Sequence, residues 1–275
     1  MIVIRECRGF DEFQACVDLQ IETWGYDEAD IMPRKSFIVA QKIGGQVIGA
    51  FDTKLPGANL GNNPQSMVGF AFSLPGVKTG NGIPRPYLHS HMLAVREPYR
   101  NRGLGAQLKL KQRDEALARG IRLIEWTFDP LEIKNAFLNI HKLGALVCGY
   151  RVDFYGISSS RLQGGLPTDR LIAEWHLDSP RVIATLEGRQ SESGIRIEKQ
   201  IIVPASIYEW KASEAGRVRA RAVQLENRSK FQQAFAQGLA VLGFRRDVDG
   251  NGIYELGSLN QAKSNLESQG NPKII

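Results

Sequence analysis

The chain has 275 residues, enough for one large domain or a domain with a subdomain, and its 35 Lys and Arg against 29 Asp and Glu give a net charge of +6. This balance favours a polyanionic partner such as a nucleotide-bearing cofactor, and the lack of a separate basic block argues against nucleic acid. Three cysteines without metal-ligand spacing predict a reduced, cytoplasmic protein that holds no metal. The opening residues 1–4 are strand-like, so we expect no signal peptide, and no apolar run is long enough to span a membrane.

Predicted strands and helices alternate through the first hundred residues. In chain order we expect a strand at 2–5, a helix at 10–24, a hairpin of 37–40 with 47–51, a loop at 54–65, a strand at 67–72, a loop at 73–86 and a strand at 87–95. The helix at 10–24 is amphipathic, with Phe13, Val17, Ile21 and Trp24 on its predicted inner face. A pair of glycines separates the two runs of the predicted hairpin.

The strand at 87–95 leads into a turn that carries the most informative motif, Arg100-x-x-Gly103-x-Gly105. We expect a helix to begin here, and the first turn of a helix leaves backbone N–H groups unpaired at the positive end of its dipole. Such a junction binds anions, and the glycines let a bulky phosphate approach the backbone. The motif therefore predicts a site for a pyrophosphate.

The rest of the chain continues the alternation and changes pattern beyond residue 178. We expect a helix at 104–119, a strand at 121–128, a helix at 131–143, strands at 145–154 and 170–177, a short helix at 182–186, a strand at 195–203, a long helix at 213–239, a hairpin of 241–245 with 252–256, and a polar tail at 260–275. Three residues mark the start of the helix at 131–143: Asp129 as N-cap, Pro130 at the first position, and Glu132 closing a capping box.

These motifs make residues 1 to about 177 similar to the GNAT superfamily of acyl-CoA-dependent N-acyltransferases. The resemblance rests on Arg100, Gly103 and Gly105, on the preceding strand LHSHMLAV and on the later helix NAFLNIHKLGA. It implies an α/β (α+β) fold with a central mixed, mostly antiparallel sheet flanked by helices. It also implies a catalytic domain at 1–177, which a smaller α/β extension at 178–259 and the tail would follow.

The resemblance implies acetyl-CoA or another short acyl-CoA as the co-substrate. It implies that the strand edge at Leu93, Ala94 and Val95 pairs with the pantetheine amides, and that this strand and the one bearing Trp126 splay apart to admit the thioester. The turn residues that it assigns to the cofactor are Arg100, Asn101, Arg102, Gly103, Leu104, Gly105 and Ala106. For Asn135 on the later helix, contact with CoA and an ordinary solvated face are equally supported.

Two histidines on the strand at 87–95 are candidates for the general base. His89 lies six residues before Val95, where relatives with a glutamate base keep that carboxylate, and a near-neutral imidazole can take a proton from an ammonium. Strand alternation places His91 on the same face, where it could serve instead. The competing interpretation is that both are polar residues hydrogen-bonded within the sheet or facing solvent.

The general acid is where this chain departs from the family's pattern. Many relatives carry a tyrosine on the later helix at the position of Ile140, which cannot protonate a thiolate. Apolar residues at helical spacing around Ile140 predict that it packs in the core. Tyr99, Tyr150, Tyr155 or solvent could replace the missing tyrosine.

Three further residues are candidates for binding the substrate. Trp126 and Asp129 end the strand that faces the slot, and the carboxylate of Asp129 would attract an ammonium, although its role as N-cap already explains it. Arg170 could hold a substrate carboxylate in a bidentate pair, or lie on the surface beside an aspartate. We expect the arginines of the long C-terminal helix to form mostly a solvated face; they are Arg217, Arg219, Arg221 and Arg228.

Two functions from different classes fit these observations. The first is an N-acyltransferase that moves an acetyl group, or another short acyl group such as succinyl, from CoA to the amine of a small molecule, for example an amino acid, by direct attack. The alternative is a non-catalytic GNAT module that binds acyl-CoA as a sensor or regulator, which the missing tyrosine favours. The two histidines favour the enzyme. Acetylation of protein N-termini or lysines would need an open groove, whereas the loops at 54–65 and 73–86 favour a small substrate. We expect no nucleic-acid or membrane partner, and a homodimer is compatible with the sequence.

Overall fold

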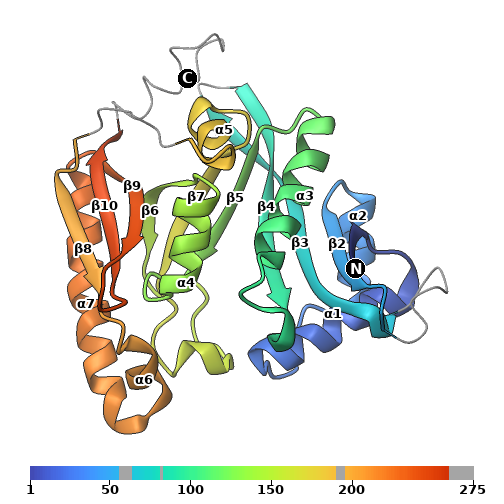
Figure 1. Ribbon diagram of the computed structural model, residues 1–275, viewed down its shortest axis with the longest axis horizontal. Coiled ribbons are helices and arrows are strands. Elements are labelled where there is room, and N and C mark those ends of the chain that lie inside the picture. Colours follow the sequence, from blue (N-terminus) through green and yellow to red (C-terminus); the bar gives the residue numbers. More distant parts are fainter. Residues whose placement is uncertain (56–63, 81–82, 190–195, 260–275) are drawn as a thin grey trace. The chain divides into compact units, whose positions relative to one another are not determined.

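The computed structural model describes residues 1–55, 64–80, 83–189 and 196–259 (Figure 1). The chain divides into two compact units: Met1–Ile124 with Ser159–Arg161 form unit 1, and Glu125–Ser158 with Leu162–Ile275 form unit 2. The predicted tail at 260–275, most of the predicted loop at 54–65, and the start of the strand predicted at 195–203 lie outside the described residues.

Unit 1 is an antiparallel sheet in the order β1-β2-β3-β4 with three α-helices. Its elements are β1 (Ile2–Glu6), α1 (Gly9–Trp24), α2 (Arg34–Lys42), β2 (Gln46–Asp52), β3 (Met67–Gly80), β4 (Ile83–Val95) and α3 (Leu104–Ala118), with 3-10 turns at Pro64–Ser66 and Glu97–Tyr99.

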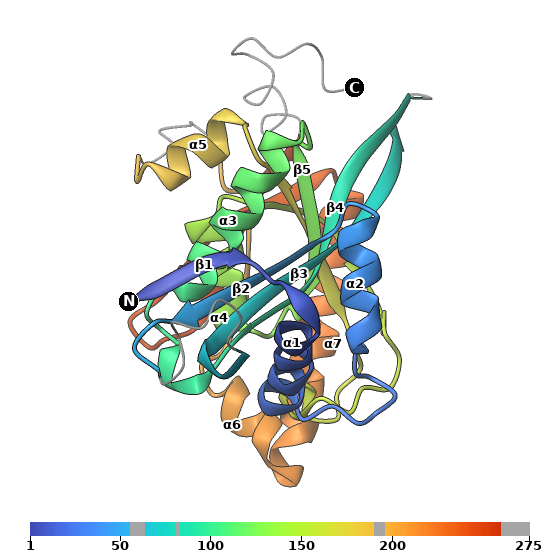
Figure 2. The same ribbon diagram turned by 90° about the vertical axis from the view of Figure 1, so that its right-hand side faces the viewer.

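The core of unit 1 lies on both faces of this sheet. Helices α1 and α2 cover one face and α3 covers the other (Figures 1 and 2). Under α2, the rings of Phe37 and Phe72 meet edge to face with centroids 4.8 Å apart. Under α3, Leu104 and Leu108 are buried against the opposite side of the strands. Because β2 contributes side chains to both clusters, its sequence is a nearly continuous apolar run.

Two predictions for unit 1 were wrong. Residues 37–40 belong to α2 and are not a strand, because Phe37 and Ala40 face the core at helical spacing while Val39 between them is exposed. Residues 73–80 and 83–86 are not a loop, because β3 and β4 stay paired through them, with Pro84 facing Thr79. Proline is tolerated in a strand where its nitrogen points away from the partner.

The helix predicted at 10–24 is confirmed as α1, and its predicted inner face is confirmed except at Ile21, since Val17 and Trp24 also pack, partly buried, against the apolar cluster. Phe13 is buried as expected, whereas Ile21 is 45% exposed and Cys16 and Leu19 are fully buried. The buried stripe thus also includes residues that the predicted inner face left out.

Unit 2 contains strands in the order β5-β7-β6-β9-β10-β8. Its elements are β5 (Leu123–Phe128), which begins in unit 1, α4 (Ile133–Ala136), a π-helical turn at Phe137–Lys142, β6 (Leu146–Arg151), a 3-10 turn at Arg161–Gln163, β7 (Arg170–His176), α5 (Pro180–Leu186), β8 (Lys199–Val203), α6 (Ile207–Ala212), α7 (Glu214–Ala236), β9 (Leu239–Arg246) and β10 (Gly252–Ser258). None of the helices within the described ranges is long and apolar enough to cross a membrane.

The C-terminal third of the chain is built into unit 2. Val147 of β6 pairs with Val241 of β9, so segments on either side of residue 177 share one sheet. Helix α7 packs on β6, β8 and β9, and the ring of Phe231 stacks on Tyr150 with centroids 5.8 Å apart. That the predicted catalytic domain ends at residue 177 stays a prediction.

The helix predicted at 131–143 starts later and is irregular. It begins at Ile133 and continues as a π-helical turn from Phe137. The N-cap is Glu132, so the predicted N-cap at Asp129 and first helical position at Pro130 are wrong; the Oδ1 of Asp129 accepts from the N–H of Leu131 at 2.8 Å in the turn that precedes the helix. The predicted capping box is wrong, since the carboxylate of Glu132 accepts from the ammonium of Lys211 at 2.8 Å instead.

Candidate active site

The turn between β4 and α3 has the backbone that the glycine motif predicts. Asn101 and Gly103 have φ values of 60° and 79°, both in the left-handed region. Glycine reaches this region without strain, and asparagine does so more readily than most residues. Gly103 is the N-cap of α3, and its carbonyl accepts from the N–H of Gln107 at 3.1 Å.

This geometry leaves a group of donors at the start of α3. Because the bonds within the helix begin at Gln107, the N–H groups of Leu104, Gly105 and Ala106 have no partner inside the helix and lie at the positive end of its dipole. A Cβ at Gly103 would meet no atom within 4 Å, so the space beside the turn is open. The arrangement fits a pyrophosphate, whose oxygens accept from such N–H groups.

Two arginines flank these donors. Arg100 is exposed, and its Nε donates to the carbonyl of Val95 at 2.8 Å, which ties the side chain to the end of β4. The guanidinium of Arg102 lies 6.0 Å from the ring centroid of Tyr99. The hydroxyl of Tyr99 donates to Asp52 at 2.8 Å, and this bond raises the pKa of the phenol.

The two histidines lie together on β4. Their ring centroids are 6.1 Å apart, and both side chains are half-buried. His91 also meets Phe72 edge to face, with ring centroids 6.1 Å apart. Phe72 belongs to the apolar cluster under α1 and α2, so the imidazole of His91 lies on that face of the sheet.

A β-bulge interrupts β4 at the histidines. Phe72 pairs with Met92 and Ser73 pairs with Ser90, so the register passes over His91. A bulge adds one residue to one strand, bends it and re-aims the neighbouring side chains. The strict alternation assumed from the sequence therefore does not hold at this point.

The surroundings keep both imidazoles uncharged at neutral pH. Burial, followed by the charges of Lys109 and Lys78, lowers the pKa of His89 from its ordinary value of 6.5. Burial and the neighbouring His89 lower the pKa of His91 to about 4. Each ring thus keeps a nitrogen lone pair that can accept a proton.

Trp126 lies in the core of unit 2. It is 4% exposed, and its ring meets Trp175 edge to face with centroids 6.0 Å apart. The indole N–H of Trp175 in turn donates to the carbonyl of Leu143 at 2.7 Å. These contacts favour a packing role, and a role of Trp126 toward substrate stays a prediction.

Asp129 takes part in a buried ion cluster. It is 8% exposed, and its Oδ2 accepts from Nζ of Lys211 at 2.9 Å. Burial alone lowers the pKa of Lys211, but the charges of Asp129 and Glu132 outweigh burial and hold it above its ordinary value. These contacts favour the structural interpretation of Asp129, and its substrate role stays a prediction.

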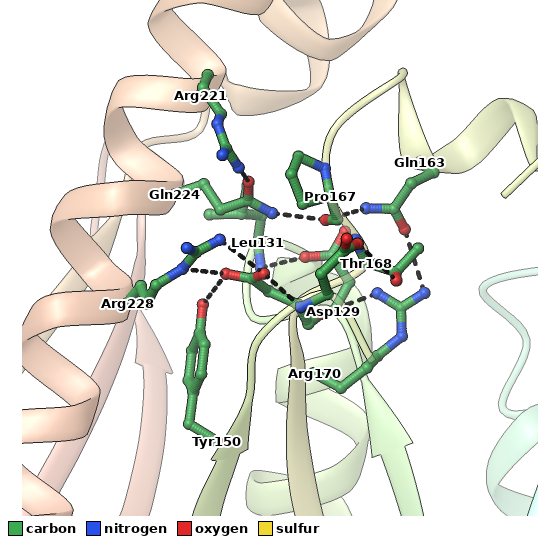
Figure 3. A network of polar contacts seen from close by, with 12 residues as sticks. Asp129, Leu131, Tyr150, Gln163, Pro167, Thr168, Arg170, Arg221, Gln224 and Arg228 are labelled. Atoms are coloured by element: carbon green, nitrogen blue, oxygen red, sulfur yellow. Dashed lines mark hydrogen bonds and ion pairs between the residues drawn. The ribbon is translucent and has the colours of Figure 1, made fainter. Parts of the chain in front are cut away.

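A second buried cluster surrounds Asp169 (Figure 3). Its carboxylate accepts from Nε and Nη2 of Arg228 at 2.8 and 2.9 Å and from the hydroxyl of Tyr150 at 2.5 Å. Burial, together with this bond, raises the pKa of Tyr150 far above its ordinary value, which argues against Tyr150 as an acid. Of the four arginines expected to form mostly a solvated face, Arg217 and Arg219 are exposed, whereas Arg221 and Arg228 are half-buried.

The carboxylate of Asp169 pairs with Arg228, whereas the neighbouring Arg170 binds other groups. Nη1 of Arg170 donates to the backbone carbonyl of Asp169 at 2.9 Å and its Nη2 to Oε1 of Gln163 at 3.1 Å. Its guanidinium lies 5.3 Å from the ring centroid of Tyr155, whose hydroxyl is 2.9 Å from Oγ1 of Thr127. Arg170 is thus held half-buried beside a tyrosine on the surface of unit 2.

The later helix carries the remaining candidates. Ile140 is 2% exposed, which confirms that it packs in the core. Asn135 is exposed, whereas Asn139, about one turn further along the helix, is buried. Contact of Asn135 with CoA stays a prediction.

Two polar residues on the inner side of α3 escaped the sequence analysis. Lys109 and Gln112 are 2% and 0% exposed, although they belong to the face that also carries Leu104 and Leu108. A lysine and a glutamine three residues apart on the apolar stripe of a helix are the signal that could have found them. Within the ranges that the structure describes, no group of three or more His, Cys, Asp or Glu could hold a metal ion.

The model of the acetyltransferase (GNAT) family matches residues 5–139, which include β4, the glycine turn and α3. This segment is thus identified as a GNAT acetyltransferase domain. No curated protein matches the chain.

Solved structures are similar to part of this chain at low sequence identity. NAA60 of Arabidopsis thaliana, in complex with a bisubstrate analogue, is 13% identical with a TM-score of 0.50, and the match covers 64% of this chain and 97% of that one. The ribosomal-protein-S18-alanine N-acetyltransferase of Escherichia coli is 17% identical with a TM-score of 0.47, covering 64% and 94%. A GNAT family acetyltransferase of Elizabethkingia anophelis with acetyl-CoA bound is 15% identical with a TM-score of 0.42, covering 64% and 97%. The predicted fold, a mostly antiparallel sheet flanked by helices, is confirmed.

Proposed function

We propose that this chain transfers an acetyl group, or another short acyl group such as succinyl, from CoA to the primary amine of a small molecule. The observation that carries the proposal is the pair of half-buried histidines on β4, the strand that leads into the glycine turn. A cofactor bound through its pyrophosphate at that turn, with its pantetheine amides paired to Leu93, Ala94 and Val95, would extend along the strand that bears both imidazoles.

In this proposal His89 is the general base. It accepts a proton from the substrate ammonium, and the free amine then attacks the thioester carbonyl. A C–N bond forms, the C–S bond breaks, the nitrogen loses its second proton to solvent, and the thiolate of CoA leaves. Because an ordinary thiol has a pKa of about 8.5, the thiolate is a good leaving group and can take its proton from solvent. The residue Ile140 at the usual tyrosine position is therefore compatible with turnover.

Substitution of the base tests this assignment. With any amine that supports turnover, His89→Ala should lower kcat by roughly 10²–10⁴-fold, the usual contribution of a general base, with little change in the affinity for CoA. His176→Ala is the matched control, because His176 lies on β7 of unit 2 beside Glu174 at 3.6 Å. A loss of only a few-fold in His89→Ala would remove His89 from the mechanism.

A further inference from the structure

A row of buried polar side chains crosses the sheet of unit 1. Gln46 of β2 pairs in register with Ser73 of β3, and Ser73 pairs with Ser90 of β4. Their exposed fractions are 2%, 0% and 5%. The hydroxyl of Ser73 donates to Oε1 of Gln46 at 3.0 Å. Three neighbouring strands thus present polar groups at one level of a core that is otherwise apolar.

Residues of helix α3 form hydrogen bonds with this row. Nε2 of Gln46 donates to the backbone carbonyl of Gln112 at 3.0 Å, and the hydroxyl of Ser90 donates to Oε1 of Gln112 at 3.0 Å. Nζ of Lys109 donates to the oxygen of Ser90 at 2.7 Å. We name Gln46, Ser73, Ser90, Lys109 and Gln112 the α3 polar network. It connects three strands and one helix through side chains that water does not reach.

Burying these polar groups costs free energy, and apolar side chains could fill the same space. A buried lysine loses most of its hydration, and removing one partner of a buried network leaves the other unsatisfied. Apolar side chains of similar size would pack there without that cost. Replacing buried charged groups by such side chains often leaves the stability of a protein unchanged or raises it. The four hydrogen bonds of the network do, however, restrict its geometry because they are directional, while Nε2 of Gln112 is buried without a hydrogen-bond partner among the described residues.

The network meets β4 where its geometry matters most. Ser73 and Ser90 are the last register pair before the bulge, and His91 is the residue that the register passes over. His89 and His91 flank Ser90 in the chain. Any shift of the Ser90 backbone therefore moves both imidazoles.

We infer that the α3 polar network holds the β4 bulge in place through Ser90 and so positions His89 and His91. Ser90, Lys109 and Gln112 are positioning residues, since they act on the histidines through the backbone of β4, in addition to the effect of the Lys109 charge on the pKa of His89. The catalytic consequence rests on the proposed function, whereas the structural claim does not.

Histidine NMR tests the structural claim without requiring turnover. The chain has only four histidines, so the ring C–H signals of His89, His91, His141 and His176 can be assigned by single replacements. Spectra of Ser90→Ala and Lys109→Met should be recorded at about pH 9, where ordinary imidazoles are neutral. Lys109, with a pKa of about 7, is then mostly uncharged as well, so a shift reports geometry more than lost charge.

The signals of His89 and His91 should move in both variants, while those of His141 and His176 stay in place. Lys111→Met is the matched control, because Lys111 lies on the same helix but pairs with Glu115 at 3.3 Å near the surface. It should leave all four signals unchanged. If either network variant fails to fold, the other still decides. Unmoved His89 and His91 signals in a folded network variant would overturn the inference, whatever happens to turnover.

Kinetics then test the catalytic consequence. With an amine that supports turnover, Ser90→Ala should lower kcat by about 10-fold to 100-fold, as expected for a small misplacement of a reacting group, while KM for acetyl-CoA stays within about two-fold. Because both residues act through one hydrogen bond, the Ser90→Ala/Lys109→Met double variant should lose little more than the worse single variant. Moved signals with unchanged kcat would contradict the positioning role and leave the proposed function standing.

Discussion

Single residues in unit 1 are tuned by burial more than by ion pairing. His89 and His91 have lowered pKa values chiefly because the sheet and its helices exclude water from them. Lys109 responds to the same cause, since burial lowers its pKa to about 7. A base that is uncharged at neutral pH suits the proposed chemistry, whereas a protonated histidine could not accept a proton.

The lowered pKa of Lys109 predicts a pH-dependent stability. An unfolded lysine titrates near 10.5 and the folded one near 7, so between these values the unfolded chain binds a proton that the folded chain has released. The free energy of unfolding of the wild type, relative to Lys109→Met, should therefore rise with pH across this window, by up to about 1.4 kcal/mol per pH unit.

Urea denaturation at several pH values across that window measures this difference. Lys111→Met, which replaces a lysine near the surface of the same helix, should show no such rise relative to the wild type. A flat difference between wild type and Lys109→Met would mean that Lys109 stays charged in the folded chain.

The glycine turn was predictable, whereas partners distant in the chain were not. Gly103 precedes a predicted helix and has the left-handed φ that glycine adopts without strain. The N-cap of the next helix is Glu132 and not, as predicted, Asp129. The ion pair of Asp129 with Lys211, 82 residues later, leaves no comparable pattern in the sequence. The same holds for Arg228, which pairs with Asp169 across 59 residues.

At the scale of elements, the glycine turn and α3 form one anion-binding unit. Gly105→Val should abolish detectable CoA binding in calorimetry, because its branched side chain would occupy the space that the phosphate oxygens need beside the first N–H groups. The far-ultraviolet circular dichroism should stay unchanged, since valine costs a helix well under about 1 kcal/mol.

Ala118→Val is the control for that variant. Ala118 is exposed at the last position of α3, far along the helix from the turn, so Ala118→Val places a valine on the same helix without touching the glycine turn. Its CoA affinity should match the wild type. Unchanged affinity in Gly105→Val would refute the assignment of the pyrophosphate to this turn.

Elements with a strong hydrophobic periodicity were predictable. Errors arose where the sequence carries signals for two kinds of structure, helix and strand or strand and loop. Long helical patterns predicted α1, α3 and α7, and the apolar runs next to them predicted strands. The helix at 34–42 is short and rich in β-formers, so its three-residue spacing was overlooked. Prolines and glycines at 73–86 indicated a loop, yet cross-strand pairing continues through 73–80 and 83–86. The β4 bulge depends on the register with β3, which one sequence does not contain.

At the scale of the whole molecule, the C-terminal third is part of unit 2. β9 pairs with β6, and Arg228 of α7 binds the buried Asp169 that precedes β7. This segment thus fixes the region from Tyr150 to Arg170, which also carries Tyr155. The family match ends at residue 139, so it says nothing of this part of the chain. The acyl donor and acceptor are accordingly open to experiment.

The most direct test of the central claim, that the chain is an acyl-CoA-dependent N-acyltransferase, is release of free CoA thiol by the intact chain. Acetyl-CoA and succinyl-CoA should each be tried with amino acids, other small amines and an N-terminal peptide, alongside calorimetry of CoA binding. We predict thiol release that depends on a small amine, with a product of the corresponding amide mass. Tight CoA binding without turnover for any pair would contradict the enzyme and establish a binding module instead, and turnover with the peptide alone would contradict the small acceptor.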